Sequence, residues 1–116
     1  AFCALGILKT NANDLNEAEE YFCRALDANI DNLLAIKSLI EISYKIEKFD
    51  RAQSYLKHFL EIYPANTNML FAMAGIQFKR GEIEDSLKNL DTLLVLDPKH
   101  QYALDFQNSV RTVSVE

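Results

Sequence analysis

Apolar residues recur along this chain in blocks in which they stand three or four positions apart. In one such block Phe22 is followed by Ala25 and Leu26, and the same spacing returns further along the chain. This spacing places the apolar side chains on one face of an α-helix, because a helix turns once in about 3.6 residues. The pattern predicts helices over residues 1–11, 16–28, 33–46, 51–63, 68–79, 83–96 and 101–116.

The blocks belong to a unit of 34 residues that runs from Thr67 to His100. The stretch from Leu33 to Asn66 matches it in register, and residues 1–32 match it with a truncated start. Aligned positions hold similar residues: Leu5, Leu39 and Met73; Ala18, Ala52 and Ser86; Phe22, Leu56 and Leu90; Ala25, Phe59 and Leu93. A period of this length with two helical blocks predicts stacked helix pairs. We therefore expect three repeats, at residues 1–32, 33–66 and 67–100, followed by residues 101–116.

Large apolar, small and turn residues occupy fixed places in each unit. They are Phe2, Leu5, Gly6, Ala18, Phe22 and Ala25 in the first unit, Ile36, Leu39, Phe49, Ala52 and Pro64 in the second, and Leu70, Gly81, Ile83 and Pro98 in the third. With these residues, about 100 of the 116 positions resemble three tetratricopeptide repeats. The resemblance implies an all-α fold, a right-handed superhelical solenoid of antiparallel helix pairs.

Residues 101–116 do not repeat the unit faithfully. Ala103, Phe106, Val110 and Val113 stand three or four positions apart and can form one apolar stripe. The terminal elements of a repeat array are atypical because they cover an apolar face that would otherwise be open. We expect a capping helix over the third pair, and the alternative is the first helix of a divergent fourth repeat.

Several residues depart from the family pattern. Ile40 stands where the family prefers Gly or Ala, so we expect the helices of the second pair to lie further apart or to be shifted. Asn13 and Glu47 occupy the turn position that Gly81 holds in the third unit. A left-handed backbone at Glu47 would cost about 1 kcal/mol, or the residue would force a different turn. Ile30 replaces the closing proline of the unit, which leaves that junction without a stop signal.

Composition and charge narrow the functional classes. The net charge of −5 leaves no basic stripe for phosphate groups, so we expect no nucleic-acid partner. No run approaches 18 apolar residues, and no segment has the parts of a signal peptide, so we expect no direct membrane insertion. The chain begins without Met, and we interpret it as a fragment of a longer protein.

Residues that could carry chemistry are few. We expect Cys3 and Cys23 to be reduced thiols, which favours a cytoplasmic location. His58 and His100 read as surface residues, because neither has a partner at the spacing of a catalytic triad. The acidic run at residues 17–20 reads as a solvated helix start that Asn16 helps to cap. We expect no metal, no cofactor and no enzymatic activity.

The resemblance implies that the first helix of each pair lines a concave groove. The residues that would point into the groove are Cys3, Ile7, Asn11, Leu34, Lys37, Glu41, Tyr44, Lys45, Asn68, Phe71, Gly75, Phe78 and Lys79. Thr10 and Ala72 lie beside them. Phe78 and Tyr44 fit packing between neighbouring pairs as well as they fit the groove, whereas Phe71 beside Gly75 favours a pocket for a ligand side chain.

The functional hypothesis is a protein–protein interaction module, a scaffold or adaptor that binds a peptide or helix of a partner in this partly apolar groove. Two alternatives stay open: a structural scaffold that self-associates into a homo-oligomer, and a non-catalytic arm of a larger enzyme such as a glycosyl transferase. Some family members hold a terminal carboxylate with a clamp of Lys, Asn and Arg. The corresponding positions hold Cys3, Ile7, Ser38, Asn68 and Ala72, which argues against a chaperone-tail reader.

Overall fold

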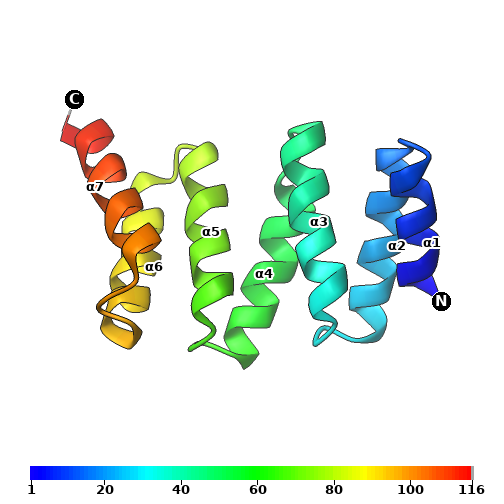
Figure 1. The fold of residues 1–116 in the computed structure, drawn as a ribbon, viewed down its shortest axis with the longest axis horizontal. Coiled ribbons are helices and arrows are strands. Elements are labelled where there is room, and N and C mark those ends of the chain that lie inside the picture. The colour runs from blue at the N-terminus through cyan, green and yellow to red at the C-terminus, as the bar shows by residue number, and fades with distance from the viewer. Residues whose placement is uncertain (116) are drawn as a thin grey trace. The chain divides into compact units, whose positions relative to one another are not determined.

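The computed structural model describes the backbone of residues 1–115 and the side chains of residues 1–113. This part of the chain contains helices and no strand (Figure 1). The helices are α1 (Phe2–Asn11), α2 (Leu15–Ala28), α3 (Leu33–Ile46), α4 (Asp50–Ile62), α5 (Thr67–Lys79), α6 (Ile83–Leu96) and α7 (Gln101–Val115). Each described boundary lies within one residue of the boundary predicted from the apolar spacing, except that the predicted end of the last helix at Glu116 lies outside the described residues. None of these helices has the length and apolarity needed to span a lipid bilayer.

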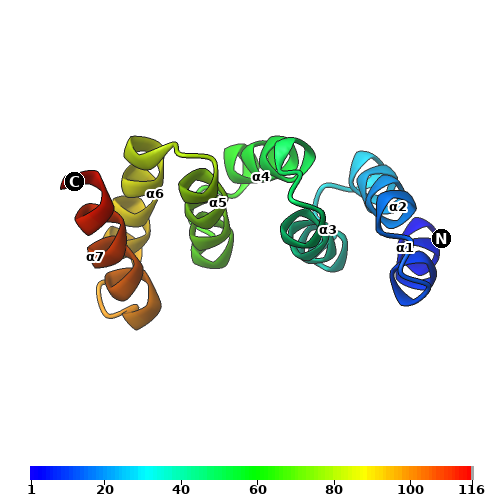
Figure 2. The ribbon, with the colours of Figure 1, turned by 90° about the horizontal axis from the view of Figure 1, so that it is seen from above.

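The chain divides into two compact units, residues 1–59 and residues 60–116. In the first unit α1 packs against α2, and α2 packs against α3. In the second unit α5 packs against α6, and α6 packs against α7. Figure 2 shows that within each unit the first helices of the pairs, α1 and α3 or α5 and α7, lie on one side. Each unit is therefore a stack of antiparallel helices with its first helices in one layer.

The turn inside each helix pair has a left-handed residue at the same repeat position. The backbone angle φ is 61° at Asn13, 57° at Glu47 and 78° at Gly81. The next residue then donates its N–H to a carbonyl of the first helix: Asp14 to Lys9 at 2.8 Å, Lys48 to Ser43 at 3.1 Å and Glu82 to Gln77 at 2.8 Å. These bonds satisfy carbonyl groups that the end of a helix leaves free. Glu47 thus accepts the strained conformation and keeps the same turn.

Asparagine side chains terminate the links between pairs. After α2, the Asn29 carboxamide oxygen accepts the N–H of Asp31 at 3.0 Å, and that of Asn32 accepts the N–H of Ala35 at 3.0 Å. The second bond caps the start of α3. The junction at Ile30 therefore has a stop signal after all, supplied by hydrogen bonds in place of proline. In the second unit Asn66 caps α5, by accepting the N–H of Met69 at 3.1 Å.

The first helix pair depends on a residue without a side chain. Gly6 of α1 lies over the ring of Phe22 of α2, and a Cβ atom at this position would stand 2.8 Å from the ring. Carbon atoms in contact prefer about 3.5–4.0 Å. The ring of Phe22 is fully buried, so it has little room to move away. The second unit is closed by a continuous core of Leu70, Ala74, Leu90, Leu93, Ala103 and Val110.

Three details differ from the sequence prediction. Phe2 and Leu5 of α1 are 37% and 39% exposed. The equivalent face of α3 packs against α2, whereas no described helix packs closely against this face of α1. Val113 is half exposed and lies outside the buried stripe of α7. Asn16 is an exposed residue of the first turn, since Asp14 precedes α2 and no side chain caps it. The wider spacing expected from the half-buried Ile40 stays a prediction.

We predict that Gly6→Ala destabilises the protein by about 1–2 kcal/mol. The new methyl group overpacks the space over Phe22, which outweighs the gain of roughly 1 kcal/mol in helix propensity. Urea unfolding followed by circular dichroism measures the change. In a Phe22→Leu background the smaller side chain makes room, so the same alanine should cost less. An equal cost in both backgrounds would refute the contact as the cause.

We also predict that Glu47→Gly raises the free energy of unfolding by about 0.5–1 kcal/mol, since glycine adopts the left-handed region without steric cost. Lys48→Gly is the matched control, because Lys48 is exposed and its φ is negative. Glycine there only adds freedom to the unfolded chain, so the control should lose stability. A loss in both variants would mean that the turn at Glu47 is not strained.

Candidate functional site

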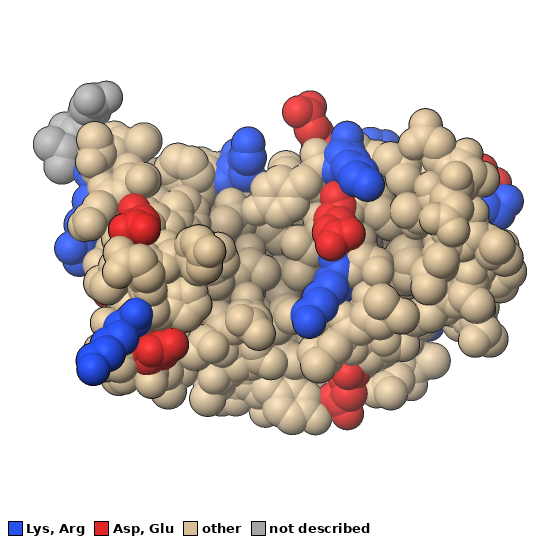
Figure 3. Space-filling model, in the orientation of Figure 1, with Lys and Arg blue, Asp and Glu red and all other residues tan. Residues whose placement is uncertain are grey.

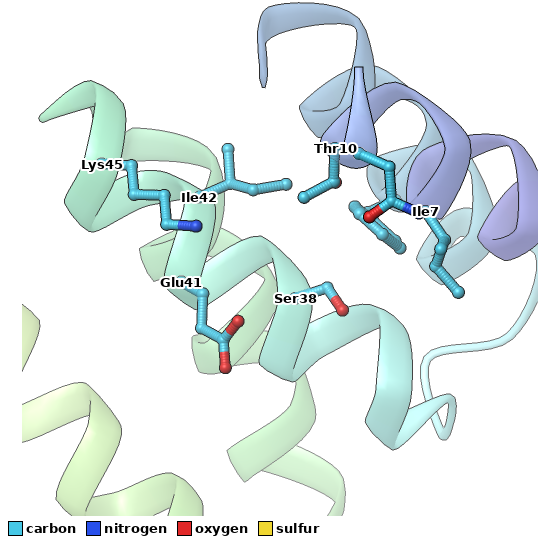
Figure 4. Close-up of a pocket in the computed structure, with 8 residues that line it drawn as sticks. Ile7, Thr10, Ser38, Glu41, Ile42 and Lys45 are labelled. Carbon is cyan, nitrogen blue, oxygen red and sulfur yellow. The ribbon is translucent and has the colours of Figure 1, made fainter. Parts of the chain in front are cut away.

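A pocket of about 80 Å³ opens between α1 and α3 in the first unit (Figure 4). Its lining residues are Ile7, Thr10 and Asn11 of α1, Phe22 of α2, and Ser38, Glu41, Ile42 and Lys45 of α3. The two first helices form its walls, and the second helix of the first pair contributes only Phe22. The pocket thus lies in the layer of first helices, where the groove is predicted.

The pocket is mainly apolar. Ile42 and Phe22 are buried in its base, and Ile7 is partly exposed at its side. The Thr10 hydroxyl group donates a hydrogen bond to the Gly6 carbonyl at 2.8 Å within α1. This bond occupies the donor of that hydroxyl group inside its own helix. An apolar group that enters would replace water against these surfaces, which is favourable.

Polar and charged groups stand at the edge of the pocket. Asn11, Glu41 and Lys45 are exposed, and Ser38 is half-buried. Among the described residues, neither Glu41 nor Lys45 forms an ion pair. Lys37, Glu41 and Lys45 follow one another every fourth residue, which places them along one face of α3. Figure 3 shows alternating positive and negative side chains over α3.

The structure brings four of the predicted groove residues, Ile7, Asn11, Glu41 and Lys45, together in this pocket. The others of the first unit lie outside it. Leu34 and Lys37 are exposed on α3, and the ring of Tyr44 packs edge-on against Phe49 at 5.1 Å. Cys3 accepts a hydrogen bond from the Asn32 carboxamide group at 3.1 Å. Whether these residues contact a partner stays a prediction.

In the second unit, Asn68 and Lys79 are exposed and Gly75 is half-buried. The pocket expected beside Phe71 stays a prediction, and the Phe71 ring packs against the stretch that begins α7. It stacks on His100 at 5.8 Å and meets the edge of Phe106 at 5.7 Å. Phe78 also packs against Phe106, at 5.5 Å. Both rings thus take part in packing between neighbouring first helices.

Other residues have roles that the sequence analysis missed. The pocket lining also includes Ser38, Ile42 and Phe22. A signal for this was present at Ser38, because the equivalent positions of the other repeats hold Ala4 and Ala72, and small residues at one repeat position indicate space there. His100 is half-buried and not a plain surface residue, because its Nδ1 accepts the N–H of Ala103 at 3.0 Å. That bond caps the start of α7. His58 is exposed as predicted.

An ion pair ties two helices of the first unit together. Arg51 of α4 contacts the Glu20 carboxylate of α2 at 2.8 Å, and this hydrogen bond lowers the pKa of Glu20.

Burial raises the pKa of the Cys23 thiol to about 11, which keeps it protonated and unreactive at neutral pH. Cys3 and Cys23 are both free. In the described part of the chain, no group of three or more His, Cys, Asp or Glu side chains is placed to hold a metal ion.

Comparison with known proteins identifies the repeat. Two sequence profiles, each described as tetratricopeptide repeat, match residues 1–32 and residues 47–108. The first TPR of Spaghetti (RPAP3), bound to the HSP90 peptide SRMEEVD, superposes with a TM-score of 0.79 at 16% identity, over 99% of this chain and 91% of that one. A tetratricopeptide repeat protein from Parabacteroides merdae superposes with a TM-score of 0.78 at 25% identity, over 94% and 44% of the two chains.

Among characterised sequences, anaphase-promoting complex subunit 3 of Dictyostelium discoideum is 27% identical over 99 residues. The match covers 84% of this chain and 10% of that protein, so this chain spans about one tenth of the length of that relative. The structural and sequence matches together confirm the all-α fold of antiparallel tetratricopeptide helix pairs.

We predict that His100→Ala lowers the free energy of unfolding by about 1–2 kcal/mol, since it removes both the cap of α7 and the ring that stacks on Phe71. His100→Asn restores the acceptor for the cap and should recover part of that loss. The control is His58→Ala, on an exposed position of α4. Urea unfolding measures all three. If His100→Ala and His58→Ala are equally mild, neither contact of His100 stabilises the second unit.

Proposed function

Because this chain belongs to the tetratricopeptide repeat family, we propose that it is a protein-interaction module that binds a peptide or helix of a partner protein. In the first unit, the binding surface is the layer formed by α1 and α3, with the pocket between these two helices as its centre. A role as a scaffold or adaptor follows, in which the module holds a partner in place and performs no chemistry on it.

The observation that supports this proposal is the pocket itself. It has an apolar base, an open side, and charged groups at its edge that pair with nothing in the described part of the chain. Sites of this kind take an apolar anchor from the ligand, while polar groups around the anchor set its orientation. A core that needed only packing would leave no such space open.

The ligand differs from the terminal carboxylate that clamp-type members of the family hold. At the clamp positions the chain has one aliphatic, one thiol, one hydroxyl, one amide and one methyl side chain: Ile7, Cys3, Ser38, Asn68 and Ala72. None of these is a cation. The similarity to a domain bound to an HSP90 peptide therefore supports the fold and not that ligand.

Self-association is the second candidate, and it has one specific observation in its favour. The apolar side chains of Phe2, Leu5 and Leu8 are exposed along α1. An open apolar face of this kind can pack against a second copy. In that case the purified protein would gain mass with concentration, which sedimentation would detect. We further propose that the partners are proteins and not nucleic acids, and that the protein works in a reducing compartment such as the cytoplasm.

A photo-crosslinking amino acid tests the binding surface. We predict that the crosslinker in place of Lys37, on the exposed face of α3, captures a partner from a lysate of the cells that produce the protein. The same crosslinker in place of Lys57, exposed on α4, is the control and should capture far less. Capture from Lys57 alone, or from neither position, would place the interaction elsewhere and refute the proposal.

A further inference from the structure

Equivalent places in the two units are filled differently, and this difference points to a specific ligand for the proposed binding site. Positions two periods apart correspond, so Thr10 corresponds to Phe78 and Ser38 to Phe106. In the second unit the rings of Phe78 and Phe106 meet at 5.5 Å and fill the place between α5 and α7. In the first unit two small hydroxyl residues stand there, and about 80 Å³ stays open.

The size of the pocket limits the group that enters. A dry protein cavity of about 150 Å³ holds a benzene molecule. A pocket of about 80 Å³ has roughly half that room, which suits a branched aliphatic side chain better than an aromatic side chain of a ligand. Ile7 at the side of the pocket and Ile42 in its base supply apolar contact. The anchor is therefore the side chain of Val, Leu or Ile.

The charges beside the pocket specify what surrounds the anchor. Lys37, Glu41 and Lys45 present positive, negative and positive groups along α3, and no ion pair joins them to other described residues. Figure 4 shows the Lys45 side chain reaching toward Ile42, while the Glu41 carboxylate points away from it. Successive groups stand about 6 Å apart along the helix axis, since four residues rise by 1.5 Å each. A partner helix with acidic, basic and acidic side chains at every fourth position matches this spacing.

We propose that the first unit binds a partner helix that inserts one branched aliphatic side chain into the pocket between α1 and α3. The acid–base–acid face of this helix lies along Lys37, Glu41 and Lys45. The aliphatic anchor supplies most of the affinity, because exposed ion pairs are individually weak. The charges fix the register and direction of the helix and reject helices of the opposite pattern. This inference rests on the proposed function.

The test uses short helical peptides and the isotope-labelled protein. The probe is a 17-residue alanine-based peptide with Glu, Lys and Glu at successive fourth positions and one Leu directly after the Lys. Binding is followed through the methyl signals of Ile7 and Ile42, which report on the pocket walls. We expect those signals to shift in a saturable way. Replacing the Leu of the peptide by Ala should weaken binding roughly tenfold, and so should reversal of its three charges.

Two protein variants make the test specific. Ser38→Phe copies the filling seen at Phe106 and should abolish binding while the protein stays folded, whereas Ser54→Phe, exposed on α4, should bind as before. Reversing the charges at Lys37, Glu41 and Lys45 together should exchange the preference, so that the charge-reversed peptide binds better. That exchange is a result that a loss of folding cannot imitate.

Several outcomes would overturn the inference. Methyl signals that do not respond to the probe exclude the aliphatic anchor, and an unchanged preference after charge reversal excludes the charge match. Equal binding of a version with a central proline, which cannot stay helical, would assign an extended segment in place of a helix. If crosslinking from position 37 still captures a partner, these failures concern the ligand alone and leave the proposed function standing.

Discussion

The close contact between Gly6 and the ring of Phe22 is the constraint on which the first unit depends. It lets α1 lie directly on α2, and the same ring then forms part of the base of the pocket beside α3. The second unit obtains a similar approach with Ala74, whose carbonyl group accepts the Ser86 hydroxyl at 2.8 Å. Packing within a pair therefore sets the positions from which the first helices present side chains to a ligand.

Hydrogen bonds between polar side chains, of which Gln77 and Gln107 are buried, join helices of the second unit. The Asn89 carboxamide group donates to Gln77 at 2.7 Å between α6 and α5, and that of Gln107 donates to Asp91 at 2.6 Å between α7 and α6. Together with the rings around Phe106, these bonds connect the first helices of this unit closely. The second unit is thus built for internal cohesion, while the first keeps space between α1 and α3.

The repeat period predicts most of the fold but only part of the site. It gives the described helix boundaries to within one residue, apart from the predicted end at Glu116, and the turn position shared by Asn13, Glu47 and Gly81, because these depend on local spacing and backbone geometry. It does not give the ring contacts of Phe71, since what fills the space between neighbouring first helices depends on which side chains meet across them. The role of His100 could not be predicted for the same reason, because its hydrogen bond to the start of α7 and its stacking on Phe71 depend on where α7 lies.

The residues that hold each helix pair together and the residues that border the pocket are almost separate sets. Gly6, Ala18 and Leu56 are needed for packing, whereas Ser38 and Lys45 are needed only for what lies between the first helices. A lineage could therefore open or close such a pocket with one nucleotide-level change in a repeat, and the framework would survive. Gene duplication of a 34-residue unit supplies many such positions at once, so new binding specificities can evolve without a new fold.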